Sequence, residues 1–259
     1  MKRVRVAERM DDPRIDPAEL DGALRAIRGV NRWLGGVRTA WRALLPALRA
    51  AAPRTCYTLL DVGTGSADVP RALVARAARI GVRIRAIGVD AHGGTLRAAR
   101  TFLGSSPAVA LVGGDARRLP FGDGAVDFVT SAMLLHHLDD DDAVSALREI
   151  DRVARLGWIV QDLARSRWAL VAIAAISRFF RSPAARHDGP ASIRQALTPG
   201  EAAELVRRAG VDPGRVRIGR RFAGRFVIRS ISASFADFRS GRSDLSQEHD
   251  RHLAEAFGE

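Results

Sequence analysis

Cysteine, lysine and tyrosine are almost absent from this 259-residue chain, which contains one of each: Cys56, Lys2 and Tyr57. A single cysteine excludes an intrachain disulfide and a metal site built from several thiolates. Aromatic residues make up only 6% of the chain. Few side chains are therefore available for stacking against the bases of a single-stranded nucleic acid.

Long apolar runs are missing as well. The longest uncharged apolar stretch, residues 168–176, is far shorter than the roughly 20 residues that cross a bilayer. The first 16 residues, MKRVRVAERMDDPRID, carry charges of both signs and no apolar segment, so they do not resemble a secretory signal. We expect a cytoplasmic protein in which residues 1–15 form a flexible leader.

The charge is unbalanced, with a formal net value of +12. Such an excess is typical of proteins that bind nucleic acid or an anionic surface. Here the arginines are spread over every predicted helix and form no single basic run. Nucleic acid is therefore not the favoured partner, and the 47% of hydrophobic residues indicates a globular chain with a packed core.

Apolar periodicity alternates between helix and strand along most of the chain. Two helices are predicted first, at 17–30 and 31–49. Further helices are predicted at 67–80, 93–103 and 140–154, and strands at 57–62, 83–89, 108–113, 125–131 and 156–162. This alternation predicts an α/β, Rossmann-like doubly wound sheet that is mostly parallel, with helices on both faces.

The pattern changes after residue 162. We expect an apolar helix at 166–180, a loop at 181–190, a capped helix from Thr198 to Gly210, and two late strands that complete a seven-stranded sheet. The predicted domains are N-terminal leader and cap helices at 1–54, a ligand-binding domain at 55–231 with an inserted lid at about 163–197, and a polar tail at 232–259. Helix 168–180 is apolar nearly all round, which favours burial or a cover over the site; contact with a membrane surface is the alternative.

The segment YTLLDVGTGSADVPRAL, residues 57–73, places a glycine-rich turn between a strand and a helix. Glycine lets the backbone turn sharply and approach a ligand closely. Dinucleotide-binding turns use G-x-G-x-x-G, but here only Gly63 and Gly65 are present and position 68 is an aspartate. Asp61 and Asp68 would repel a pyrophosphate, so the turn favours a cationic ligand.

Acidic residues also end the next two strands. Asp90 follows the second strand, where a carboxylate accepts hydrogen bonds from ribose hydroxyls in many nucleoside-binding folds. Asp115 follows the third, where it can accept from an adenine amine while Ala116 offers its backbone N–H to a ring nitrogen. Read singly, each of these aspartates could equally cap a helix or a turn. Together they indicate a charged adenosyl compound.

The motifs LLDVGTGSADVP, AIGVDA, GGDARRLPF, VDFVTSAMLLHHLDD and LREIDRVAR, in this order over about residues 55–162, resemble those of class I S-adenosylmethionine-dependent methyltransferases. The branch that they resemble includes quinone-biosynthesis enzymes, and residues 187–210 are similar to bacterial relatives that methylate phenolic or polyketide-derived products. One departure is Ala67, where the family usually has a third glycine.

This resemblance implies S-adenosylmethionine as cofactor and a set of binding residues. Asp61, Gly63, Thr64 and Gly65 would line the methionine part and the sulfonium, Asp90 and Ala91 the ribose, Asp115 and Ala116 the adenine, and Ser131 and Met133 the reactive methyl. No metal is expected.

Methyl transfer from a sulfonium is an in-line displacement in which the protein aligns the acceptor and excludes water. A phenolic acceptor, with a pKa near 10, benefits from a general base. The candidates are His136, His137 and His187. Because neighbouring side chains point in different directions, we expect at most one of His136 and His137 to face the ligand, and a packing role for His137 stays open.

The favoured function is O-methylation of a small hydrophobic phenolic, quinone-like or polyketide-derived metabolite by a monomer or homodimer. C-methylation of a quinone precursor is the alternative. A nucleic-acid methyltransferase, a non-catalytic S-adenosylmethionine-binding scaffold and an NAD-dependent oxidoreductase are the rivals, and the residues after the fourth strand, SAMLLHH, lack an Asn-Pro-Pro-aromatic target-base motif.

Overall fold

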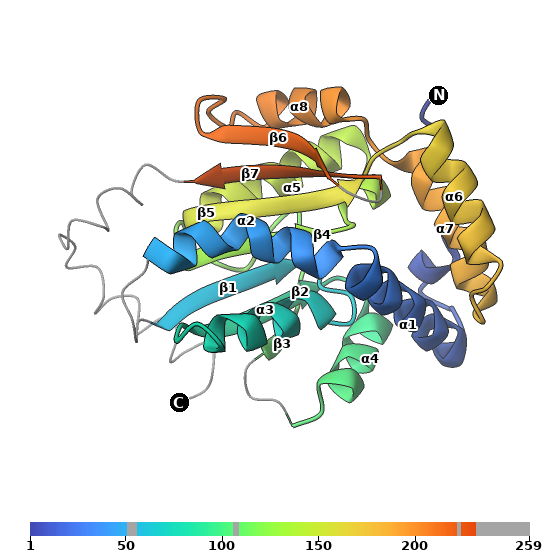
Figure 1. Ribbon diagram of the computed structural model, residues 1–259, viewed down its shortest axis with the longest axis horizontal. Coiled ribbons are helices and arrows are strands. Elements are labelled where there is room, and N and C mark those ends of the chain that lie inside the picture. Colours follow the sequence, from blue (N-terminus) through green and yellow to red (C-terminus); the bar gives the residue numbers. More distant parts are fainter. Residues whose placement is uncertain (51–55, 106–108, 222–223, 232–259) are drawn as a thin grey trace.

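The computed structural model describes residues 1–50, 56–105, 109–221 and 224–231. Within them lies a seven-stranded sheet in the order β3-β2-β1-β4-β5-β7-β6, as shown in Figure 1. The strands are β1 (Cys56–Val62), β2 (Arg83–Asp90), β3 (Val109–Gly113), β4 (Val126–Ala132), β5 (Ala154–Leu163), β6 (Val216–Arg221) and β7 (Arg225–Ile231). β1 to β5 pair in parallel, whereas β6 and β7 are antiparallel. The predicted fold class is confirmed.

Eight α-helices connect and cover the strands in the described part of the chain. They are α1 (Pro17–Trp33), α2 (Gly36–Ala50), α3 (Asp68–Ala78), α4 (Gly93–Leu103), α5 (Asp140–Val153), α6 (Arg167–Ser177), α7 (Pro183–Gln195) and α8 (Pro199–Arg208). In that same part, no helix is both long and apolar enough to cross a membrane.

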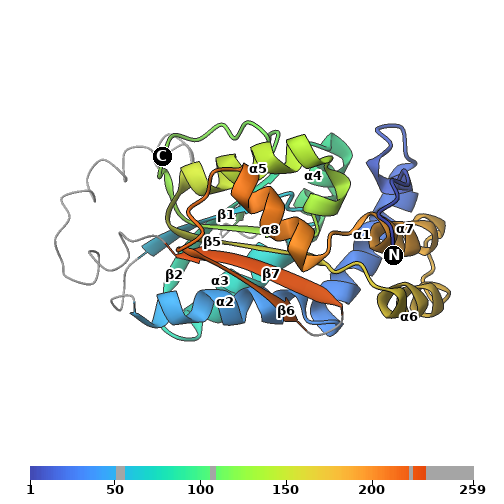
Figure 2. The same cartoon turned by 90° about the horizontal axis from the view of Figure 1, so that it is seen from above.

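The strands alternate their buried side chains between two cores. Leu60 and Val62 of β1 belong to the core beneath α5 and α8, whereas Tyr57 and Leu59 belong to the core beneath α2 and α3. Figure 2 shows these helix pairs on opposite faces of the sheet. The two cores follow from the strand period of two residues. Because β1 to β5 run in the same direction, the loops that follow them all lie at one edge of the sheet.

The helices α1, α6 and α7 lie together beyond that edge, at the carboxyl ends of the parallel strands (Figure 1). α7 packs against both α1 and α6. Ligands of open α/β sheets bind where strand order reverses, outside the carboxyl ends. Here β1 lies between β2 and β4, so the reversal falls at the end of β1.

Two expectations about loops and leaders were wrong. The segment expected as a loop at 181–190 is most of helix α7, which begins with Pro183 at its first turn and the Ser182 hydroxyl capping the backbone N–H of Ala185. The expected flexible leader packs onto the fold: Arg3 donates to the carbonyl of Gln195, and Glu8 is 5% exposed. In both cases, contacts with the rest of the fold order a segment whose proline, glycine or charged residues had suggested irregular structure.

The expected burial of helix 168–180 was also wrong. Of α6, only Ser177 is buried, and the side chains that follow one another at helical spacing along its outer side are exposed. Trp168 is 84% exposed and Phe179, just beyond the helix, 87%. The opposite side packs on α7. The predicted tail at 232–259 lies outside the described residues.

Candidate active site

A cavity of about 410 Å³ opens at the carboxyl ends of β1, β2 and β4, between them and α1 and α7. Nine of the ten residues predicted to bind the cofactor line it: Asp61, Gly63, Thr64, Gly65, Asp90, Ala91, Asp115, Ala116 and Met133. The tenth, Ser131, is buried beneath the cavity without lining it. The sheet register explains this convergence, because Asp61 pairs with Thr130 of β4 and Gly88 of β2.

Asp61 lies fully buried at the end of β1. Its two carboxylate oxygens accept hydrogen bonds from the hydroxyls of Thr130 at 2.6 Å and Thr64 at 2.8 Å. Burial raises the pKa of this carboxyl to about 7, although both hydroxyls favour its ionised form. A cation placed beside Asp61 would pull its pKa back down.

The turn after β1 holds three alternate residues in the left-handed region. Gly63 has φ +68°, Gly65 +56° and Ala67 +57°. A Cβ at Gly63 would come within 3.0 Å of the Leu134 side chain. Ala67 stands where the family usually has glycine. The backbone keeps its left-handed conformation there, although alanine adopts that conformation less readily than glycine does.

Asp90 joins the end of β2 to this turn. Its carboxylate accepts from the backbone N–H of Gly65 at 2.9 Å and from that of His92 at 2.9 Å. Burial raises its pKa, and the two N–H groups act in the opposite direction. Each oxygen retains a lone pair, so the carboxylate can still accept the hydroxyls of a ribose.

Asp115 differs from the other two acids because it is already engaged by a cation. Arg117 donates to both of its oxygens, and this pairing lowers the pKa of the Asp115 carboxyl. The residue lines the cavity from a half-exposed position. An adenine amine that contacted Asp115 would have to share the carboxylate with the Arg117 guanidinium.

Both histidines that follow β4 line the cavity, which corrects the expectation that at most one would face the ligand. They lie on a 3-10 turn, Leu135–His137, with their ring centroids 4.2 Å apart. His136 Nδ1 is 2.6 Å from Asp162 Oδ1, and His137 Nδ1 is 2.8 Å from Asp11 Oδ2. In each ring a carboxylate therefore holds Nδ1, and Nε2 points away from that carboxylate.

Burial on its own would lower the pKa of His137. The hydrogen bond to Asp11 and the negative charge of Glu8 outweigh burial and raise the pKa to about 9. His137 is thus protonated at neutral pH in this state and has no lone pair free to accept a proton.

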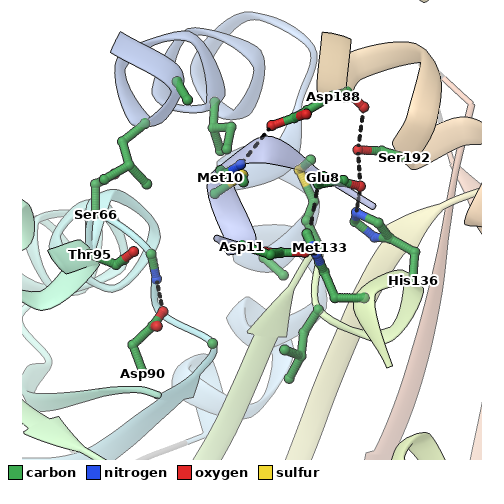
Figure 3. A pocket seen from close by; sticks show the side chains of 18 of the residues that line it. Glu8, Met10, Asp11, Ser66, Asp90, Thr95, Met133, His136, Asp188 and Ser192 are labelled. Atoms are coloured by element: carbon green, nitrogen blue, oxygen red, sulfur yellow. Dashed lines mark hydrogen bonds and ion pairs between the residues drawn. The ribbon is translucent and has the colours of Figure 1, made fainter. Parts of the chain in front are cut away.

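The leader contributes a carboxylate to the same corner of the cavity. Glu8 Oε1 accepts from Ser192 Oγ at 2.8 Å and Gln195 Nε2 at 2.7 Å, both on α7. It lies 3.7 Å from His136 Nε2. Figure 3 shows Glu8, Ser192 and His136 on one side of the cavity and Asp90 on the other.

His187, the third base candidate, lies elsewhere. Its side chain is 42% exposed on α7, its Nδ1 is 2.8 Å from Asp188 Oδ1, and it does not line the cavity. Asp188 itself faces inward and accepts from the backbone N–H groups of Arg9 and Met10. The helix therefore directs the aspartate of the HDGP segment to the site and leaves its histidine outside.

Comparisons with known proteins point to one family. Residues 60–160 match the model of a family described as "Methyltransferase domain". A demethylmenaquinone methyltransferase of Roseiflexus sp. (strain RS-1) is 35% identical over 188 residues, which cover 68% of this chain and 75% of the relative.

The chain belongs to the class I S-adenosylmethionine-dependent methyltransferases. It is accordingly an enzyme that uses S-adenosylmethionine as its methyl donor.

Solved structures show the same fold. A SAM-dependent methyltransferase from Aquifex aeolicus superposes with a TM-score of 0.55 at 18% identity, covering 84% of this chain and 99% of its own. Human N-acetylserotonin methyltransferase, in complex with SAM, gives a TM-score of 0.56 at 16% identity, covering 81% of this chain and 54% of its own.

Several residues of the methyltransferase cavity were missed by sequence reasoning. Four of them line the cavity: Glu8, Asp11, Asp188 and Ser192. A fifth, Asp162, lies behind His136 and holds its Nδ1. Asp162 ends the fifth predicted strand, so the rule that selected the acids of the first three strands would also have selected it. Glu8 and Asp11 carried no such signal, because nothing in the first 15 residues indicates which strand end they reach.

Proposed function

We propose that this methyltransferase acts on a small hydrophobic acceptor with a hydroxylated aromatic ring, of the quinol or phenol class. The observation that carries the proposal is the contrast between the two ends of the cavity. Asp61 and Asp90 supply carboxylates at the strand ends. The other end holds Glu8, His136 and His137, called here the Glu-His-His cluster, together with Asp11, Asp188 and Ser192, among apolar side chains.

The apolar walls of that end come from three helices and the loops beside them. Leu24, Ile27 and Val30 of α1, Ile173 of α6, Phe180 after it and Ile193 of α7 line it. These side chains suit a flat hydrocarbon ring and exclude water from the sulfonium. A hydroxyl on such a ring finds its polar partners in the Glu-His-His cluster.

Loss of the hydroxyl proton allows methylation at either of two atoms. A phenolate attacks a methyl group through oxygen, or through the ring carbon next to it, which then loses its own proton. The Roseiflexus relative is named a demethylmenaquinone methyltransferase, and this supports the carbon as the nucleophile and a quinol as the acceptor. O-methylation of a phenol is the second candidate, because the cluster would face the hydroxyl oxygen itself.

Methyl transfer to two matched acceptors tests this proposal. The protein is incubated with ¹³C-methyl S-adenosylmethionine and either a short-chain demethylmenaquinol analogue or 1-naphthol, which lacks the second hydroxyl. Carbon-bound and oxygen-bound methyl groups differ clearly in ¹³C chemical shift. We expect a carbon-bound methyl on the quinol; an oxygen-bound methyl on either ring would favour the second candidate. No transfer to either ring, in a protein that binds S-adenosylmethionine, would overturn the acceptor class.

We also propose that the enzyme is cytoplasmic and meets its acceptor at an anionic membrane surface. The exposed stripe of α6 consists of Trp168, Val171, Ala172, Ala175 and Ile176, and Phe179 continues it. Arg167, Arg178 and Arg181 are exposed around it. Apolar side chains fringed by arginines complement the interface of an anionic bilayer. The opposite side of α6 reaches the cavity through Ile173, which connects this surface to the acceptor end.

A further inference from the structure

Three atoms of the Glu-His-His cluster converge within 4.8 Å of one another: a carboxylate oxygen of Glu8 and one nitrogen from each of His136 and His137. His136 Nε2 is 3.7 Å from Glu8 Oε1, and His137 Nε2 is 3.9 Å from Glu8 Oε2. Both separations are too long for hydrogen bonds. Among the described residues, none offers a hydrogen bond to His136 Nε2, although the side chain is completely buried.

Both imidazoles are held as metal-binding histidines usually are. In such sites, the ring nitrogen that does not bind the ion donates to a carboxylate, which fixes the tautomer and the direction of the ring. Here Asp162 holds Nδ1 of His136 and Asp11 holds Nδ1 of His137. Ser192 and Gln195 donate to Glu8 Oε1 and fix the carboxylate in turn.

The local charge also fits a cation. Three carboxylates, on Glu8, Asp11 and Asp162, approach the two imidazoles; those of Glu8 and Asp162 are buried, and that of Asp11 is half-exposed. The buried guanidinium of Arg225 interacts electrostatically with Asp162. Buried carboxylates are costly unless a cation compensates them. In the present state the protonated His137 does so, and a metal ion bound at its Nε2 would displace that proton and take over the role.

We propose that Glu8, His136 and His137 form a binding site for a divalent transition-metal ion, with Zn²⁺ as the representative ion. Two imidazoles and one carboxylate are the ligands of many zinc and non-haem iron centres. Tetrahedral zinc keeps its ligand atoms roughly 3.4 Å apart, so separations of up to 4.8 Å would have to shorten by up to about 1.4 Å to close the site.

Three protein ligands leave at least one position of the ion open, and the cluster faces the cavity. If the acceptor belongs to the proposed hydroxylated class, its oxygen would take that position. The ion would lower the pKa of the hydroxyl, whose proton leaves to water, and the methyl group would then pass from the sulfonium to the acceptor while the electron pair stays on sulfur. The metal site itself stands independently of this use.

Zinc binding to the full-length, tag-free protein tests the site. The protein is stripped with a chelator and titrated calorimetrically with Zn²⁺ alone, and Co²⁺ is added in parallel for its visible absorption. We expect one equivalent of metal per chain. His136→Asn and Glu8→Gln should weaken binding at least 100-fold and remove the cobalt band, and Asp162→Asn should weaken it about 10–100-fold.

The matched control is His187→Asn, which removes an imidazole outside the cluster and should bind as the wild type does. If His136→Asn does not fold, as judged by circular dichroism, the isosteric Glu8→Gln and the partly exposed His137→Asn decide the question. Failure of the wild type to bind one equivalent, or binding that Glu8→Gln and His137→Asn leave unchanged, would overturn the site.

The metal site and the proposed function fail in different ways. Stoichiometric zinc without methyl transfer to a hydroxylated ring would refute the acceptor class and leave the site standing. Full methyl transfer by chelator-treated protein that binds no zinc would refute the site and leave the acceptor class standing.

Discussion

His136 Nδ1 lies 2.6 Å from Asp162 Oδ1, and both side chains are almost wholly buried. Burial on its own would raise the pKa of Asp162, but its electrostatic interaction with His136 and the hydrogen bond between them lower the pKa below its usual value. Asp162 also accepts from the backbone N–H of His136 at 3.1 Å. This carboxylate therefore decides which nitrogen of His136 faces the acceptor end of the cavity.

Replacing Asp162 should impair methyl transfer without weakening cofactor binding. In Asp162→Asn the amide can present its N–H to the imidazole and favour the wrong tautomer, so we expect kcat to fall about 10–100-fold. The affinity for S-adenosylhomocysteine, measured by calorimetry, should stay within twofold of the wild type. Loss of that affinity together with kcat would mean that Asp162 supports the fold as a whole.

Asp90→Asn should weaken S-adenosylmethionine binding by about 10- to 100-fold, which corresponds to the loss of a charge-assisted hydrogen bond. The amide keeps an oxygen for one of the two backbone N–H groups, so the turn is less disturbed than in an alanine variant. Asp123→Asn is the control, because Asp123 is exposed and pairs with Arg152 outside the cavity. Equal affinities of both variants and the wild type would remove Asp90 from the ribose site.

Cofactor affinity should depend on pH through Asp61. The pKa of its carboxyl is about 7 without ligand, and a bound cation favours the ionised form, so binding near pH 7 must release a proton. Affinity should therefore fall as pH drops below 7 and level off above it. Calorimetry in buffers of different ionisation enthalpy measures the released proton directly. Asp61→Asn should abolish this proton release. If the wild type released no proton on binding, the proposed contact between Asp61 and the cofactor would be contradicted.

The stripe on α6 should bring the enzyme to anionic lipid. Vesicles that contain phosphatidylglycerol should co-sediment with the wild type, whereas vesicles of phosphatidylcholine alone should not. Trp168→Ser combined with Phe179→Ser should reduce sedimentation at least fivefold. Because both side chains are more than four-fifths exposed, thermal stability should be unchanged. Binding that persists in the double variant would place the contact elsewhere.

Arg225 is a buried cation whose removal should stabilise the fold. Its side chain is 1% exposed, none of its guanidinium nitrogens finds a hydrogen-bond partner in the described part of the chain, and burial lowers its pKa. Arg225→Met should raise the free energy of unfolding by about 1–3 kcal/mol in a denaturant titration. A decrease would show that attraction to Asp162 outweighs the cost of burying the charge.

The sequence predicted the parallel sheet well because each element there carries its own signal. Buried strands read as apolar runs, and Gly63, Asp90 and Asp115 mark where strands end. The acceptor end lacked such signals. Pro183 and Gly189 suggest a loop, yet packing of α7 on α1 and α6 makes a helix. Glu8 reaches the site through contacts with α7 that depend on the whole fold.

The exposed face of α6 was also beyond what local sequence can predict. An apolar helix normally indicates burial, because water is a poor solvent for its side chains. Whether a second surface covers it depends on neighbours that local sequence does not specify. Trp168 is exposed because α7 packs only on the other side of the helix.

A crystal structure of the protein with S-adenosylhomocysteine tests the central claim most directly. We predict the ribose hydroxyls within hydrogen-bond distance of the Asp90 carboxylate, the sulfur beside Gly63 and Met133, and the adenine near Asp115 and Ala116. Density for the ligand outside this cavity, or a ribose that leaves Asp90 uncontacted, would contradict the account.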